Sequence, residues 1–295
     1  ILLFSAPFSF PGKLLVHIES GSTGQDIAHQ LKSQHAIRSE LVFRILLRLY
    51  GDSTHIVAGT YYFPDAQNAF SIAWRLRVGN FDIEPVRVTI PEGTSVKQMS
   101  VILADQIAGF DTTTFLKLAL PQEGYLFPDT YFFYTGEDAN DIVKTLRENF
   151  DTQIADIHVQ SALHASGKSL STIITMASLL EKEAPDTINR QMVADILWKR
   201  LSIDMPLQVD AVFPYITGKN GDDITQNDYV IDSPYNTYTH KGLPPGPITS
   251  PGIDAIVAAT HASSTPYLYY LSGKDGNFHY SATYEGQLAN QKKYR

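Results

Sequence analysis

Two glutamates separated by one lysine, Glu181-Lys182-Glu183, close a stretch of otherwise apolar residues. A carboxyl group at the margin of an apolar surface ionises less readily, and a neutral carboxyl can act as a general acid near neutral pH. In a helix over 169–184, at about 100° per residue, Glu181 falls at the edge of the apolar stripe. Glu183 falls on the other flank, further from its centre. The spacing favours Glu181 as the acid, but both glutamates could equally be ordinary solvated residues at a helix end.

Residues suited to binding a sugar gather in three later stretches. The longest, Tyr-Asn-Thr-Tyr-Thr-His at 235–240, precedes a proline-rich loop at 242–252, and shorter ones lie at 205–210 and 278–281. Aromatic rings cover the apolar faces of sugars, while amides and hydroxyls pair with their polar groups. Each residue could equally make a structural hydrogen bond within a loop. The candidate substrate contacts are Gln208, Asp210, Tyr235, Asn236, Thr237, Tyr238, His279 and Ser281.

The composition excludes several kinds of chemistry. A net charge of −8 argues against nucleic acid as a non-specific electrostatic partner, but not against a neutral glycan. The absence of cysteine rules out disulfides, thiolate metal sites and thiol nucleophiles. The nine histidines show no metal-ligand spacing. We therefore expect neither a metal nor a cofactor.

A repeat organises the N-terminal third of the chain and predicts its elements. The pattern Val-x-Ile-x-x-Gly at 16–21, followed by Ile27, recurs at 88–93, followed by Met99. In each copy a strand of period two reaches a glycine turn and then enters a helix that buries the later residue.

The first copy continues into a second helical stretch at 39–50 and a strand at 58–63. Strand, helix, helix, strand is the order of a LysM-type module, which binds glycans containing N-acetylglucosamine. Many small α+β units share this order, so a spacer or packing module is the alternative. We predict an α+β fold with a LysM-like βααβ subdomain in residues 1–85. A mixed α+β catalytic domain then covers 86–295, beginning with the second strand-helix copy.

Several longer blocks, in order along the chain, resemble the endolytic murein transglycosylase family (MltG- or YceG-like). The resemblance runs from about residue 14 to residue 295 and is strongest from Glu123 onward. In that family the first glutamate of the Glu-Lys-Glu block is essential, which corresponds to Glu181. The family usually has asparagine where this chain has Lys199. The matching blocks are EGYLFPDT at 123–130, MASLLEKE at 176–183, MPLQVD at 205–210, YNTY at 235–238 and GLPPG at 242–246.

The resemblance implies a lyase that cleaves the β-1,4 bond between N-acetylmuramic acid and N-acetylglucosamine inside nascent peptidoglycan strands. Ordinary glycosidases need two carboxyl groups. A lytic transglycosylase uses the C6 hydroxyl of the sugar as nucleophile, so one carboxyl suffices and a 1,6-anhydro end forms. Glu181 would protonate the glycosidic oxygen and then remove the C6 hydroxyl proton.

Two other functions stay open at this point. A hydrolytic muramidase would need a second carboxylate, for which Asp210 is the best candidate, although Glu183 could also assist. A peptidoglycan-binding scaffold would bind glycan without cleaving it. A pyridoxal phosphate lyase, a label that such proteins have also carried, finds no support, because the glycine-rich phosphate cradle is missing.

The resemblance also implies a location and partners. It predicts a single-pass protein of the inner or plasma membrane with its catalytic domain on the periplasmic or outer side. Residues 1–10 are largely apolar but too short to span a bilayer, so we expect the anchor to be largely missing from this chain. Peptidoglycan strands are the expected partner, and the resemblance suggests peptidoglycan synthases as protein partners.

Overall fold

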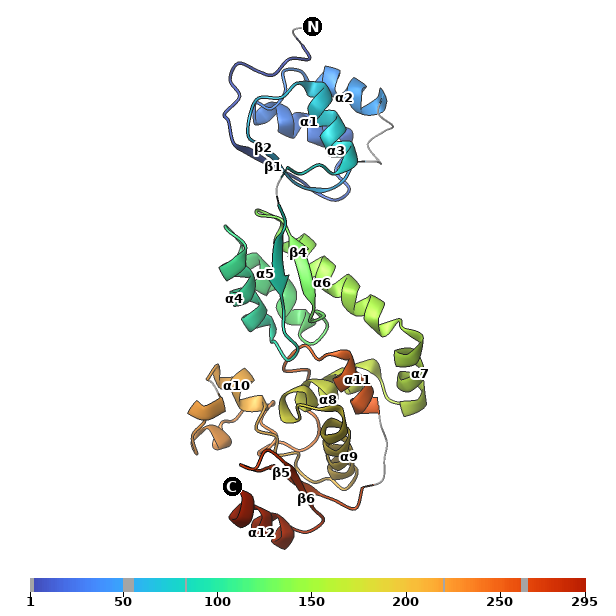
Figure 1. Ribbon diagram of the computed structural model, residues 1–295, viewed down its shortest axis with the longest axis vertical. Helices are drawn as coiled ribbons and strands as arrows, with labels where there is room; N and C mark the ends of the chain where they lie inside the picture. The colour runs from blue at the N-terminus through green and yellow to red at the C-terminus, as the bar shows by residue number, and fades with distance from the viewer. Residues whose placement is uncertain (1–2, 50–55, 83, 220, 261–264) are drawn as a thin grey trace. The chain divides into compact units, whose positions relative to one another are not determined.

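The protein is described here by a computed structural model, shown in Figure 1. Its mixed α+β fold confirms the predicted class. The chain divides into two compact units, each with its own hydrophobic core. The described residues are 3–49, 56–82, 84–219, 221–260 and 265–295. The first unit comprises Ile1–Val88, Val101–Thr114 and Thr130–Ile142, and the second comprises Thr89–Ser100, Phe115–Asp129 and Val143–Arg295.

The first unit starts with the predicted order of strand, helix, helix and strand. Strands β1 and β2 pair antiparallel, from Leu14 opposite Phe63 to Ile18 opposite Gly59. The predicted 39–50 helix is observed as α2, and residue 50 lies outside the described residues. The elements are β1 (Leu14–Ile18), α1 (Gly24–Ser33), α2 (Glu40–Leu49), β2 (Gly59–Phe63) and α3 (Ala69–Val78).

The sequence repeat is also a repeat of structure. The second copy forms β3 (Val86–Thr89) and α4 (Val96–Gln106), followed by α5 (Thr112–Ala119), a 3₁₀ turn (Leu120–Gln122) and β4 (Thr130–Phe133). Strand β3 pairs with β4. The three repeated apolar positions are equally buried in the two copies. Each of these six side chains is at most 1% exposed. These positions are Val16, Ile18 and Ile27 in the first copy, and Val88, Ile90 and Met99 in the second.

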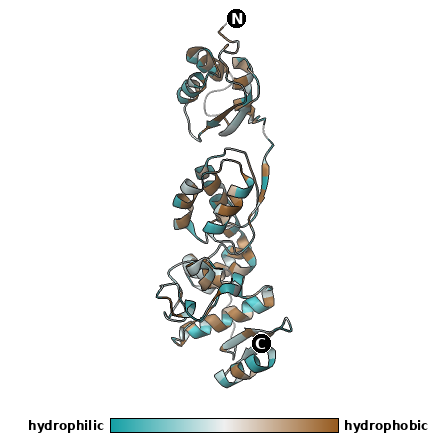
Figure 2. Cartoon of the chain, turned by 90° about the vertical axis from the view of Figure 1, so that its left-hand side faces the viewer, coloured by the Kyte–Doolittle hydropathy of each residue, from teal (hydrophilic) through white to brown (hydrophobic). Residues whose placement is uncertain are grey.

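The second unit is built around α8 (Leu170–Glu183), which packs against α9 (Thr187–Ser202) and α11 (Ile253–Thr260). Every residue from 173 to 180 is buried, so α8 is enclosed on all sides and does not show the single apolar stripe that we predicted. Figure 2 shows hydrophobic residues along the helices of both units. The other elements are α6 (Ala139–Ile154), α7 (Ile157–Ser166), α10 (Val212–Thr217), β5 (Tyr269–Ser272), β6 (Phe278–Ser281) and α12 (Tyr284–Tyr294).

The predicted membrane localisation needs correction. Within the described ranges, no helix combines the length and the apolar character that crossing a bilayer requires. The longest described helices, α6 and α9, have 16 residues each, whereas a spanning helix needs about 20 apolar residues. The prediction of a single-pass membrane protein is therefore wrong for the part of the chain that the structure describes.

Candidate active site

Glu181 lies in the last turn of α8, and its side chain is 6% exposed. Both carboxylate oxygens have a donor: the backbone N–H of Gly252 at 2.9 Å from Oε2, and Nη2 of Arg190 at 3.0 Å from Oε1. The Nε of Arg190 also donates to the carbonyl oxygen of Ala184. Glu181 is therefore a buried carboxyl group with fixed partners.

The reversal of the chain between α8 and α9 brings Arg190 to Glu181. Ala184 has an extended backbone (φ −137°, ψ 129°), as the ring of the following Pro185 favours, so α8 ends there. Asp186 then caps α9 by accepting a hydrogen bond from a backbone N–H of its first turn. Arg190 follows four residues later and reaches back to the last turn of α8.

A glycine turn lets a second segment approach Glu181. Gly93 has φ +72°, and a Cβ on it would lie 3.3 Å from Cγ of Glu181. Glycine adopts this left-handed conformation at little cost, and any side chain there would press on α8. Thr94 pairs with Ser250 in a β-bridge supported by backbone hydrogen bonds of 2.9 and 3.0 Å. The bridge fixes the segment that brings the backbone N–H of Gly252 to Glu181.

Burial raises the pKa of Glu181 above its ordinary value. The Gly252 N–H, the Arg190 guanidinium and Lys182 lower that pKa, whereas Glu92 raises it, and the effect of burial prevails. The protonated form of Glu181 therefore persists to higher pH than that of a solvated glutamate. A carboxyl group in that state can donate its proton to a leaving oxygen.

Glu92 is an exposed carboxylate beside this site and was not among the residues predicted from the sequence. Its carboxylate occupies the space where a Cβ on Gly252 would lie, so Glu92 and Glu181 both contact Gly252. The repeat identified the turn that contains Glu92. It could not relate that turn to Glu181, which lies 89 residues later. Arg190 and Gly252 were missed for the same reason.

Glu183 has different surroundings from Glu181. Its Oε2 accepts a 2.7 Å hydrogen bond from the hydroxyl of Tyr270, and its Oε1 accepts a 3.3 Å hydrogen bond from the backbone N–H of Ala211. Burial raises the pKa of the Glu183 carboxyl and that of the Tyr270 hydroxyl. Glu183 thus joins the end of α8 to β5 and to the start of α10.

Gln208 and Asp210, two predicted substrate contacts, are exposed and alternate with buried residues. Leu207 and Val209 are 0% exposed. Gln208 has φ +51°, a left-handed conformation that is uncommon for a residue with a side chain. Asp210 accepts a 2.5 Å hydrogen bond from the hydroxyl of Tyr238. This segment therefore offers polar groups to solvent on a well-packed backbone.

Asn236 and Thr237 use their polar groups inside the protein. Asn236 is 0% exposed, and its Nδ2 donates to the carbonyl oxygens of Tyr229 and Ile231 at 3.1 and 2.9 Å. Thr237 is 2% exposed, and its Oγ1 accepts a hydrogen bond of 2.9 Å from the N–H of Val209. In the structure both residues hold the loop against the neighbouring segment.

Tyr235 and Tyr238 belong to a group of aromatic rings around α10. Tyr235 packs on Tyr215 with ring centroids 5.0 Å apart. Tyr238 packs on Phe213 at 5.6 Å and on Tyr229 at 4.9 Å. Both tyrosines are partly exposed.

His279 and Ser281 lie on β6. The Nε2 of His279 is 3.0 Å from an oxygen of Asp275, and its ring stacks on Tyr294 with centroids 3.5 Å apart. Ser281 is 8% exposed and bonds to Gln287. These contacts stay within the β5–β6 hairpin and α12. The structure thus brings the 208–210 and 235–238 stretches together, while the described partners of Glu181 come from other segments.

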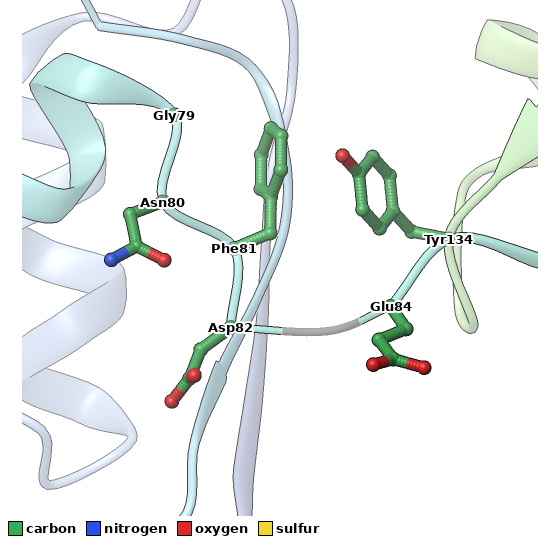
Figure 3. A pocket seen from close by; sticks show the side chains of 6 residues that line it. All are labelled: Gly79, Asn80, Phe81, Asp82, Glu84 and Tyr134. Carbon is green, nitrogen blue, oxygen red and sulfur yellow. The ribbon is translucent and has the colours of Figure 1, made fainter.

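The first unit contains a separate pocket of about 380 Å³ (Figure 3). The ring of Phe81 packs between Tyr61 and Tyr134, with centroid distances of 4.7 and 4.5 Å. The pocket is lined by Gly79, Asn80, Phe81, Asp82, Glu84 and Tyr134.

In the described part of the chain, no three His, Asp or Glu side chains converge in a way that could hold a metal ion.

The fold and the site define a mixed α+β protein with two buried carboxyl groups, Glu181 and Glu183, at the end of a central helix. The YceG-like family matches residues 16–293, and the chain belongs to that family. A crystal structure of a YceG-like protein from Listeria monocytogenes superimposes with a TM-score of 0.62 at 29% identity. The match covers 94% of this chain and 98% of that one. The resemblance seen in the sequence is therefore confirmed.

Two curated relatives carry the name endolytic murein transglycosylase. The protein of Bacillus subtilis (strain 168) is 31% identical over 306 residues, which cover 95% of this chain and 84% of the relative. The protein of Streptococcus pneumoniae (strain D39) is 27% identical over 317 residues, which cover 93% of this chain and 57% of the relative. The predicted enzyme class, lytic transglycosylase, is the class that these names give, and the prediction of an enzyme is confirmed.

Proposed function

We propose that this chain is an endolytic lytic transglycosylase that cleaves the β-1,4 bond between N-acetylmuramic acid and N-acetylglucosamine in peptidoglycan. Glu181 is its catalytic acid and base, and the product carries a 1,6-anhydro-N-acetylmuramic acid end. The observation that carries the proposal is the burial of Glu181, with its raised pKa, at the end of α8. The names of the relatives support the same activity.

The reaction needs one proton donor that later becomes a proton acceptor. Protonated Glu181 gives its proton to the glycosidic oxygen, and the bond from that oxygen to the anomeric carbon breaks. Arg190 and the N–H of Gly252 stabilise the resulting carboxylate through their hydrogen bonds. The carboxylate then takes the proton of the C6 hydroxyl, whose oxygen bonds to the anomeric carbon. No water is consumed, and Glu181 returns to its protonated state.

The exposed members of the predicted substrate set are proposed to contact the glycan. Gln208 and Asp210 are exposed polar residues, and Tyr235 and Tyr238 are partly exposed aromatic ones. Asn236 and Thr237, which were predicted as contacts, support the site indirectly through their internal hydrogen bonds. His279 and Ser281 remain weaker candidates, because their described contacts are made within the hairpin and α12.

We further propose that β1, α1, α2 and β2 form a LysM-like subdomain that binds glycan strands within residues 1–85, and that residues 86–295 form the catalytic part. The βααβ order and the antiparallel pairing of β1 with β2 support this assignment. Peptidoglycan synthases are the proposed protein partners, because nascent strands are the proposed substrate.

The decisive experiment is digestion of purified peptidoglycan by the wild-type protein and by Glu181→Gln. We expect the wild type to release glycans with anhydro ends and Glu181→Gln to lose at least about 100-fold of that activity, since the amide cannot donate a proton as an acid. Mass spectrometry identifies the anhydro product, which is lighter by one water than the hydrolysis product. Glu148→Gln, on the exposed side of α6, is the matched control and should keep full activity.

Three results would contradict the proposal. Undiminished anhydro product from Glu181→Gln would exclude Glu181 as the acid and direct attention to Glu183. Reducing ends in place of anhydro ends would identify the hydrolytic alternative, for which Asp210 was the candidate second carboxylate. In the structure, Asp210 is engaged by the hydroxyl of Tyr238. Glycan binding without cleavage would identify a scaffold.

A further inference from the structure

A second carboxylate stands next to the proposed acid, and the single-carboxyl mechanism does not use it. The carboxylate of Glu92 lies directly against Gly252, whose backbone N–H donates to Glu181 at 2.9 Å. Since both carboxylates contact one residue, standard bond lengths place oxygens of the two groups within roughly 7 Å of each other. Two carboxylates at such a separation repel each other when both are ionised.

Glu92 is held in this place by the local backbone. Gly93 follows it in the left-handed conformation and packs against α8. Thr94 then pairs with Ser250 in the β-bridge, and its hydroxyl donates to the carbonyl oxygen of Pro91 at 2.5 Å. The turn is therefore tied at both ends, while the Glu92 side chain remains exposed. An exposed carboxylate on a fixed turn suits an electrostatic role better than a packing role.

We propose that Glu92 is a positioning residue of the catalytic centre, whose negative charge keeps Glu181 protonated before cleavage and makes it a stronger base afterwards. This inference rests on the proposed function of Glu181. The first effect follows because an ionised neighbour disfavours a second negative charge. The second follows because the same repulsion drives the Glu181 carboxylate to take up a proton from the C6 hydroxyl.

The effect of Glu92 on the pKa of Glu181 is opposite to that of two nearby cations. Arg190 faces Glu181 from α9, and Lys182 acts on it from the same helix. Both cations lower the pKa of Glu181, as does the backbone N–H of Gly252, whereas Glu92 raises it. Without Glu92, the opposition to ionisation would come from burial alone.

The test is the pH dependence of kcat for anhydro product formation by Glu92→Gln. The general acid must be protonated, so activity falls as the pH rises through the pKa of Glu181. Removing the Glu92 charge lowers that pKa, and the alkaline limb of the profile should move to lower pH by about 0.5 to 1 unit. We expect kcat to fall several-fold at neutral pH with KM changed less than about twofold, and Glu92→Asp to restore much of the profile.

Two further variants test the same electrostatic effect without substituting Glu92. Lys182→Gln removes a cation and should move the alkaline limb in the opposite direction, to higher pH. Gly252→Ala places a methyl group where the Glu92 carboxylate lies, and that flexible carboxylate can swing away, so this variant should resemble Glu92→Gln. Circular dichroism and thermal unfolding, with Glu148→Gln as control, verify that each variant is folded.

The outcomes separate this inference from the proposed function. If Glu181→Gln loses activity and Glu92→Gln keeps the wild-type pH profile, the role of Glu92 is refuted while that of Glu181 stands. A uniform loss of activity in Glu92→Gln, with no shift of the alkaline limb, would also refute it, because a merely structural role gives that result. Undiminished anhydro product from Glu181→Gln would remove the proposed role of Glu181, whereas absence of anhydro product from the wild type would remove the proposed function itself.

Discussion

Two glutamates one residue apart have different partners and therefore different roles. Glu181 is paired with a guanidinium and one backbone N–H, next to an exposed carboxylate. Glu183 is bonded to a tyrosine hydroxyl and to the backbone at the start of α10. Burial raises the pKa of both. A raised pKa alone therefore does not identify the acid, and the surroundings of each carboxyl do.

Glu183→Gln is expected to keep most of the activity. The amide oxygen can still accept the hydrogen bond from Tyr270, and a neutral group fits a buried site that already disfavours charge. We expect kcat to fall less than about tenfold, with the pH profile unchanged, measured on the same peptidoglycan digest. A loss as large as that of Glu181→Gln in a folded protein would instead make Glu183 a catalytic group.

At the scale of elements, α8 holds the site because several segments are attached to it. Ser178, which is 0% exposed, accepts a hydrogen bond of 3.1 Å from the N–H of Ile248 through its hydroxyl. Its carbonyl oxygen accepts one from the hydroxyl of Thr249 at 3.3 Å. These bonds fix the proline-rich loop just before Gly252. The loop thereby delivers the backbone N–H that Glu181 uses.

The N-terminus of α4 is capped by Glu123, whose two oxygens accept hydrogen bonds of 3.1 and 3.2 Å from the N–H of Val96. Burial raises the pKa of Glu123 to about 7. The Glu123 carboxyl therefore stays protonated in the folded protein at pH values where the same carboxyl of the unfolded chain has lost its proton. As a result, the contribution of Glu123 to stability decreases as the pH rises from about 4.5 to about 7.

Glu123→Gln should weaken this pH dependence. We expect the free energy of unfolding of the wild type, measured in urea, to fall relative to that of the variant between pH 5 and pH 8, by at most about 3 kcal/mol. Gln cannot ionise, so the variant lacks this contribution at every pH. Parallel curves for the two proteins across that range would show that Glu123 does not titrate as described.

At the scale of the whole molecule, each unit has its own core, and the proposed chemistry lies within the second unit. Arg200, which is 5% exposed, joins separate parts of that unit. Its Nε donates to the carbonyl oxygen of Leu268 at 2.7 Å, and its Nη1 donates to that of Leu207 at 2.6 Å. One side chain thus links α9 to the segment carrying Gln208 and to the chain before β5.

Arg200→Lys should destabilise the second unit although the charge is kept. A lysine ammonium on a flexible stem cannot reproduce the planar fork that reaches both carbonyl oxygens. We expect a loss of roughly 1 to 3 kcal/mol in the free energy of unfolding, because at least one buried carbonyl loses its donor. Thermal and urea unfolding of the full chain, with Lys292→Arg on exposed α12 as control, provide the measurement. Unchanged stability would show that the fork is not needed.

The sequence determined the features that depend on neighbouring residues. The Val-x-Ile-x-x-Gly repeat predicted both strand-to-helix turns, because alternation and a glycine are local signals. Ala184-Pro185 marked the end of α8, since proline restricts the residue before it. The family blocks singled out Glu181. The order of elements and the preferred acid therefore follow from local sequence and family resemblance.

The tertiary structure alone decided what surrounds that acid. The groups near Glu181 come from segments 9, 71 and 89 residues away in sequence, and no local periodicity relates them. Packing also enclosed α8 on every side, which the predicted stripe did not show. Asn236 and Thr237 make internal hydrogen bonds because other segments of the chain pack against them. Local sequence fixes backbone preference, whereas burial and charge at a site depend on which distant segments pack around it.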